Sequence, residues 1–415
     1  MHLPLRAARL LPLFLLVVLL PTALFYARLA TSMSAGVTVA CLMIVAIGVL
    51  DAGIRRTLGM PFKVAAWVAA LLAGHLVLAS TFGPIDLVRG IGSIFMLMVL
   101  IVAAHVLATL IMAASPGALK QASMRCLGVL GFIGVMAILG IAQPPSWEKP
   151  AFPFTEPSHL AVAVAPFLVA APLGLRPLKR TAWLLAFVVI GALLKNLTMI
   201  VACALAALIT LRPIQVLALL GLLVPIVLSQ NLDYYLARLD FSQDSQNLSS
   251  LVFLQGWQLM DESLHATHYV GRGFQQLGLV DSDSQATQLI YALIQDSLNL
   301  LDGGFTMSKL VCELGAAGIA LALALIGVTW RATRTLRLAM ASPRAAARIP
   351  AARVFAAAIL VGYLIELLVR GVGYFSPSGL LMVSSLWIWY RTRAVRVART
   401  FERTTPGPVG PVAAS

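Results

Sequence analysis

Apolar residues dominate this chain in twelve separate runs, several of them short. The runs cover residues 10–29, 33–50, 64–82, 91–112, 125–142, 159–175, 181–194, 197–211, 213–229, 309–330, 353–371 and 378–390. Short polar turns separate most of them, but a polar stretch of about eighty residues, 230–308, follows the ninth run. The pattern predicts an all-α polytopic membrane protein with about twelve transmembrane helices and one large loop between helices.

Composition supports a membrane protein, because 60% of the residues are hydrophobic, 11% are charged and the mean hydropathy is +0.93. The first run resembles a signal peptide, but it is long and a second run follows almost at once, so we expect a retained span. The net charge of +14 then reflects loops kept in the cytoplasm, and we expect no nucleic-acid partner. No Cys-x-x-Cys spacing occurs among the four cysteines, so neither a disulfide framework nor a zinc site is indicated.

One apolar stretch, 181–211, is too long for a single span. As one helix it would measure about 46 Å, against a hydrocarbon core of about 30 Å, and Lys195-Asn196 interrupts it. If it forms two spans, 22 of the 30 lysines and arginines fall on the cytoplasmic side, whereas one span leaves 14 inside and 15 outside. The charge bias therefore favours two spans, with both termini cytoplasmic.

This topology divides the chain into four parts and places the long loop outside. Residues 1–229 hold spans one to nine with the Pro-rich periplasmic link 143–158, residues 230–308 form the large periplasmic loop, residues 309–390 hold spans ten to twelve, and residues 391–415 form a basic cytoplasmic tail. Within the loop, 249–264 and 285–301 place apolar residues at helical spacing. Such short helices lie on the membrane surface or cap the helix bundle.

Basic residues are few on the outer side, and most of them are arginines. A guanidinium group binds phosphate through two parallel hydrogen bonds and stays charged when partly buried, so converging arginines suggest a lipid phosphate or pyrophosphate. The alternative is ordinary anchoring at the membrane interface. The eight outer residues are Arg28, Arg89, Lys149, Lys195, Arg238, Arg272, Lys309 and Arg370.

A carboxylate and an imidazole stand together in Glu156-Pro-Ser-His159, at the mouth of the sixth run. This pair suits a proton acceptor and its orienting partner. Equally, Ser158 suits the N-cap of the helix that follows. Glu366, one helical turn before Arg370, is a candidate partner for that arginine.

Taken in order, these motifs resemble the Wzy-type O-antigen and exopolysaccharide polymerase family, which forms one superfamily with the O-antigen ligases. The motifs are Glu156-Pro-Ser-His159, Arg238 followed by Ser249-Ser250 and Trp257, Gly271-Arg-Gly-Phe274, Asp302-Gly-Gly-Phe305 leading into Lys309-Leu and Glu313-Leu-Gly315, and Arg370-Gly-Val-Gly-Tyr-Phe375. The resemblance covers about residues 140–390.

The resemblance implies glycosyl transfer at the periplasmic face of the bacterial inner membrane, without metal or cofactor. A glycan on undecaprenyl pyrophosphate moves onto the sugar of an incoming lipid-linked repeat unit. The expected partners are these lipid-linked glycans, the bilayer, and a chain-length regulator or export-complex proteins. The implied roles are catalysis for Glu156, His159 and Arg238, pyrophosphate binding for Arg89, Arg272 and Arg370, and secondary roles for His268, Asp302 and Lys309.

Two other functions compete with polymerisation. Ligases that join O-antigen to the lipid A core carry an essential histidine just before the Glu-containing span, and residues 302–309 contain none, unless His265 or His268 replaces it. A transporter or flippase is expected to show paired halves and polar residues near mid-span. Here the first five spans are nearly free of charge, which favours chemistry at one face. A scaffold role within an export complex stays open.

Overall fold

A computed structural model of the chain describes residues 7–141, 151–228, 247–295, 300–341, 345 and 347–404. Among these residues the regular structure is helical, apart from isolated bridge residues such as the pair Ala151 and Phe154. Seven helical segments of this part of the chain are long and apolar enough to cross a membrane. The expected all-α polytopic membrane fold is therefore confirmed at this level.

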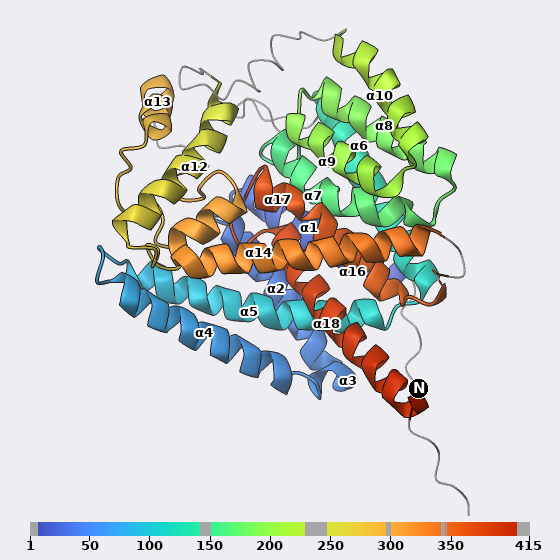
Figure 1. Cartoon of the computed structure of the whole chain (residues 1–415), viewed down its shortest axis with the longest axis horizontal. Helices are drawn as coiled ribbons and strands as arrows, with labels where there is room; N and C mark the ends of the chain where they lie inside the picture. The colour runs from blue at the N-terminus through green and yellow to red at the C-terminus, as the bar shows by residue number, and fades with distance from the viewer. Residues whose placement is uncertain are drawn as a thin grey trace, which may run out of the picture.

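Helices occur at all twelve predicted apolar runs, and Figure 1 shows their arrangement. They are α1 (Ala7–Tyr26), α2 (Met33–Leu50), α3 (Ala52–Arg55), α4 (Gly59–Ala79), α5 (Leu87–Met112), α6 (Pro116–Ile138), α7 (Pro157–Ala170) with the 3-10 helix η1 (Ala171–Gly174), α8 (Pro177–Leu193), α9 (Leu197–Thr210), α10 (Pro213–Leu228), α12 (Leu248–Ala266), α13 (Gln285–Ile294), α14 (Thr306–Ala341), α16 (Ala351–Gly362), α17 (Leu364–Leu368) and α18 (Pro377–Thr404). The seven candidate spans are α2, α4, α5, α6, α7 with η1, α14, and α16 with α17.

The long apolar stretch 181–211 is divided as its length predicts. Helix α8 ends at Leu193, Lys195 adopts a left-handed conformation with φ 50°, and Asn196 caps α9 by accepting a hydrogen bond from the Met199 amide at 3.3 Å. The Asn196 side chain also donates to the Pro157 carbonyl at 2.6 Å. This turn is thereby attached to the start of α7.

Aromatic packing holds the centre of the bundle. Phe14 of α1 is fully buried; it stacks on Phe355 of α16 at 5.5 Å and meets Phe167 of α7 edge-on at 5.7 Å. The outward faces of the long helices are also apolar, since Leu71 of α4 and Phe95 of α5 are 70% and 62% exposed. Large apolar side chains on the outside of long helices suit contact with lipid rather than water.

Hydrogen bonds connect neighbouring helix ends of the bundle. The Lys120 ammonium of α6 donates to the Gly174 carbonyl at 2.7 Å, and Arg391 of α18 donates to Thr109 of α5 at 3.1 Å. At the end that holds α12 and α13 (Figure 1), the Asp86 amide donates to the Gln276 side chain at 2.8 Å. Each of these contacts joins segments that the charge count assigns to one side of the membrane.

The polar loop packs on the bundle through α12. Gly256 of α12 lies directly against Gly303 and Phe305, where no Cβ would fit, and α13 packs on the other flank through Ala286 and Ile290. The predicted second loop helix, 285–301, is wrong at its end, because Gln295 adopts φ 54° and α13 stops at Ile294. Helix α14 continues to Ala341 and α18 continues to Thr404. The polar segments that follow the apolar runs 309–330 and 378–390 therefore begin as helix.

Candidate functional site

An ion pair joins the start of α7 to the chain after α17. The Arg370 guanidinium donates through Nη2 to Oε2 of Glu156 at 3.2 Å, across 214 positions of sequence. The Ser158 hydroxyl donates to the same carboxylate oxygen at 2.6 Å. Glu156, not Ser158, occupies the N-cap position of α7, so the predicted N-cap role of Ser158 is wrong and this hydroxyl helps to hold the carboxylate.

The expected partner of Arg370, Glu366, lies elsewhere. Its carboxylate is buried and accepts a hydrogen bond from the Ser378 hydroxyl. Pairing at a spacing of four residues needs a continuous helix, but α17 ends at Leu368 and the Arg370 amide bonds back to the Ile365 carbonyl. The end of the helix therefore separates the two side chains, and the predicted Glu366–Arg370 pair is wrong.

The neighbours of Glu156 favour its charged form. Partial burial raises the pKa of the Glu156 carboxyl, but Arg370, His159 and the hydrogen bonds from Ser158 and Arg370 outweigh this effect and hold the pKa below its ordinary value. The carboxylate is about half exposed, whereas the Arg370 side chain is only 16% exposed. Among the described residues, Arg370 Nε is buried without a hydrogen-bond partner.

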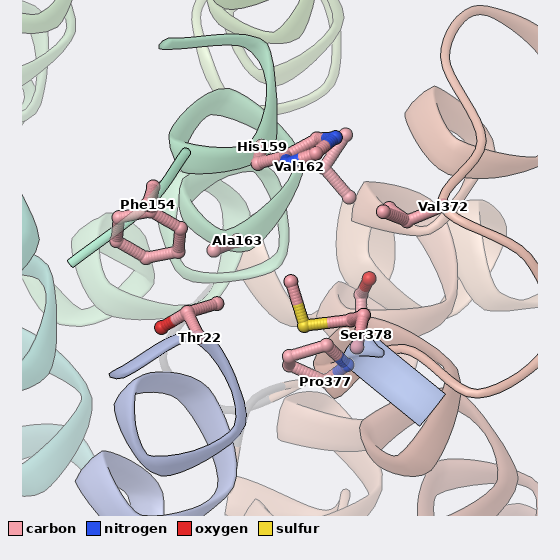
Figure 2. Close-up of a pocket in the computed structure, with 9 residues that line it drawn as sticks. Thr22, Phe154, His159, Val162, Ala163, Val372, Pro377 and Ser378 are labelled. Atoms are coloured by element: carbon pink, nitrogen blue, oxygen red, sulfur yellow. The ribbon is translucent and has the colours of Figure 1, made fainter. Parts of the chain in front are cut away.

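His159 lies beside this pair at a small pocket. Its Nδ1 is 3.0 Å from the Thr155 hydroxyl, and its ring interacts electrostatically with Glu156, Arg370 and Asp302. Figure 2 shows His159 and Phe154 on one side of the pocket and Val372, Pro377 and Ser378 opposite them. The imidazole is therefore held in place at the point where α7 faces the segment after α17.

Two further candidates lie nearby, Asp302 in the loop before α14 and Lys309 in the first turn of α14. Lys309 is almost fully buried; its ammonium donates to the Leu301 carbonyl at 2.7 Å and to Asp302 Oδ1 at 3.2 Å, and it lies 3.9 Å from Glu313. This loop contacts the chain beside Arg370 directly. The Gly371 amide donates to the Gly304 carbonyl at 3.0 Å, and a Cβ on Gly373 would lie 3.0 Å from Asp302 Oδ1.

A break in α14 supports this arrangement. Gly315 has φ 56° and ψ −131°, and the segment 269–273 lies against the break. The backbone of this segment forms hydrogen bonds with amide and carbonyl groups of α14 at the break. The Ala316 amide donates to the Tyr269 carbonyl at 2.8 Å, and the Gly273 amide donates to the Glu313 carbonyl at 2.9 Å. A broken helix inside a membrane needs such replacement partners. The Glu313 carboxylate is fully buried there and accepts from the Gln275 amide at 2.9 Å.

The other predicted residues lie outside this group. Arg272 pairs with Glu262 at 2.7 Å, and Glu262 also accepts a hydrogen bond from Ser282. Arg89 is half-buried near Glu313, and His268 is exposed with its ring against Phe82. Arg238 lies outside the described residues.

The structure thus brings together Glu156 and His159 of the proposed catalytic residues, Arg370 of the proposed pyrophosphate-binding residues, and the secondary candidates Asp302 and Lys309. Sequence reasoning missed Thr155, although its spacing of four residues from His159 was a usable signal, and it missed Glu262, whose pairing with Arg272 has no local signature. Within the described ranges, no cluster of His, Cys, Asp and Glu could hold a metal ion.

Comparison with family models, with curated proteins and with solved structures gives no match to this chain. The chemistry of the site is therefore argued from its own geometry.

The buried Lys309–Glu313 pair gives a test of how this site is held together. We expect Lys309→Met to lower the free energy of unfolding by about 3 kcal/mol, because it leaves the Glu313 carboxylate buried without its cation. The double variant Lys309→Met with Glu313→Gln should recover part of this loss, since the glutamine is neutral and still accepts from Gln275. Thermal unfolding of the purified protein in detergent measures both. A double variant less stable than Lys309→Met would contradict the pairing.

Proposed function

We propose that the protein is a glycosyltransferase that polymerises lipid-pyrophosphate-linked oligosaccharide repeat units. The contact that best supports this proposal is the pair between Arg370 and Glu156, with His159 beside it. It combines a planar cation suited to phosphate with a carboxylate and an imidazole suited to a hydroxyl group. The same set of side chains supports the resemblance to the O-antigen and exopolysaccharide polymerases.

In the proposed reaction a hydroxyl oxygen of the acceptor sugar attacks the anomeric carbon of the donor sugar. The bond from that carbon to the pyrophosphate oxygen breaks, and polyprenyl pyrophosphate leaves with the bonding electrons. The proton of the acceptor hydroxyl passes to His159 or Glu156, the two groups that can accept it. Arg370, whose side chain is 16% exposed, stabilises the negative charge that develops on the pyrophosphate.

We place this chemistry at the periplasmic face of the bacterial inner membrane, in a chain with twelve spans. The charge distribution supports this orientation, because 22 of the 30 lysines and arginines then lie in the cytoplasm. The end of the bundle with α12 and α13 would face the periplasm, where the sugar of a lipid-linked substrate is presented.

Polymerisation is favoured over ligation because the segment 302–309, which joins the loop to the start of α14, brings Asp302 and Lys309, and no histidine, to the site. It is favoured over transport because the paired charges of the site gather at one end of the bundle.

Activity provides the direct test of the proposal. Purified protein in liposomes receives lipid-pyrophosphate repeat units, with and without a lipid A core acceptor, and the product length is read on a gel. We expect long chains without the core acceptor. Arg370→Ala should lower the rate about 100-fold or more, because one stabiliser of developing charge is lost, and Arg370→Lys should recover only part of it, since the planar fork is missing.

Arg28→Ala serves as the matched control, because Arg28 is an exposed arginine on the same predicted side and has no contact with Glu156 or His159 in the described part of the chain. Its rate should stay within about twofold of the wild type. Transfer only to the core acceptor would indicate a ligase. Absence of any product, with lipid substrate moved across the bilayer, would indicate a transporter and contradict the proposal.

Cysteine labelling tests the proposed orientation. The native cysteines Cys41, Cys126, Cys203 and Cys312 are buried, so an impermeant maleimide reports added cysteines at exposed positions. We expect Gln285→Cys to react in right-side-out vesicles and Arg176→Cys to react in inside-out vesicles, since both side chains are exposed at opposite predicted faces. The reverse pattern would place the site in the cytoplasm.

A further inference from the structure

One side of α12 combines aromatic rings with a carboxylate and an imidazole, and Trp257, Asp261 and His265 on it are exposed. Phe253, Trp257, Asp261 and His265 follow one another at a spacing of four residues, which places them along one side of a helix. Trp257 is 45% exposed, and the side chains of Asp261 and His265 are 78% and 70% exposed. The stripe measures about 18 Å from Phe253 to His265 at 1.5 Å per residue.

Some neighbouring side chains along the stripe interact. The Phe253 and Trp257 rings lie 6.3 Å apart, and His265 Nδ1 lies 3.3 Å from Asp261 Oδ1. Beyond the helix, the ring of Tyr269 lies 6.4 Å from that of His265. We call these five residues the α12 stripe: Phe253, Trp257, Asp261, His265 and Tyr269.

The aromatic end of the stripe adjoins the candidate site. Phe305 is fully buried beneath it, stacked on Phe253 at 5.2 Å and in contact with Trp257 at 5.4 Å. On its other side, Phe305 lies against Gly371, where a Cβ would come within 2.8 Å of the Phe305 backbone. Gly371 directly follows Arg370, so one buried aromatic residue, Phe305, lies between the aromatic end of the stripe and the chain segment that carries the ion pair.

The chemistry of the stripe fits a carbohydrate. One face of a sugar ring carries C–H groups that pack on an aromatic face, while its hydroxyl groups donate to carboxylate and imidazole acceptors. Aromatic surface alternating with a few polar groups is typical of sites for small polar ligands. Contact with the bilayer is less suitable, because Asp261 and His265 would then have to leave water.

We propose that the α12 stripe binds the sugar portion of a glycan and guides it to the Glu156–Arg370 pair. This inference rests on the proposed function and specifies where its carbohydrate substrate lies. Trp257 provides the main stacking surface and Asp261 accepts hydrogen bonds from sugar hydroxyl groups. The lipid pyrophosphate is not needed for this contact, so the stripe binds free oligosaccharide.

Direct binding of a sugar without its lipid tests the inference. The probe is the oligosaccharide that mild acid releases from the lipid-linked glycans of the expressing cells, and isothermal titration with the purified protein measures its affinity. We expect Trp257→Ala to weaken binding about tenfold or more, Asp261→Asn to weaken it several-fold, and Trp257→Phe to keep most of it. Trp330→Ala is the control, because Trp330 is 60% exposed on α14 and contacts Arg334 rather than the stripe.

The outcomes separate the inference from the proposed function. Loss of sugar binding in Trp257→Ala, with an unchanged unfolding temperature and normal binding in Trp330→Ala, supports the stripe even if no glycan transfer is found. Wild-type affinity in Trp257→Ala overturns the stripe even if transfer is found. Unchanged sugar binding, with both tryptophan variants weakening association with lipid vesicles, also overturns it and identifies Trp257 as a membrane anchor.

Discussion

The ion pair between Glu156 and Arg370 connects parts of the chain that lie 214 positions apart. A charge inside an apolar bundle is costly unless a partner of opposite sign accompanies it. The same constraint pairs Lys309 with Asp302 and Glu313, and Arg272 with Glu262. The Glu156–Arg370 and Lys309–Asp302 pairs lie at the candidate site, where the start of α7, the start of α14 and the chain after α17 come together, and the Arg272–Glu262 pair lies outside it.

The described part of the long polar loop therefore packs directly on the helix bundle. Helix α12 packs through Gly256 on Phe305. The segment 269–273 forms hydrogen bonds with the backbone of α14 at the break at Gly315. A site built in this way draws its carboxylate and imidazole from the start of one helix and its guanidinium from the end of another. Under the function proposed above, such a site would place a pyrophosphate beside the guanidinium and the acceptor hydroxyl beside the carboxylate and the imidazole.

Much of the fold could be predicted from the sequence, because apolar runs and interrupting residues are local signals. The turn at Lys195-Asn196 is an example, since thirty-one apolar residues exceed one span. The grouping of Glu156, His159 and Arg370 was also expected. Glu366 was the wrong partner for Arg370, because helical spacing does not reveal that α17 ends at Leu368. The break at Gly315 was missed since its cause, the backbone at 269–273, is distant in sequence.

Zero-length cross-linking tests the central claim, that Arg370 pairs with Glu156, most directly. In an Arg370→Lys variant the new ammonium can form an amide with a carboxylate in contact with it when a carbodiimide is added, and peptide mass spectrometry identifies the linked residues. The structure predicts a link between positions 370 and 156 that disappears when Glu156→Gln is added. A link from position 370 to Glu366 instead, or none to Glu156, would contradict the site described above.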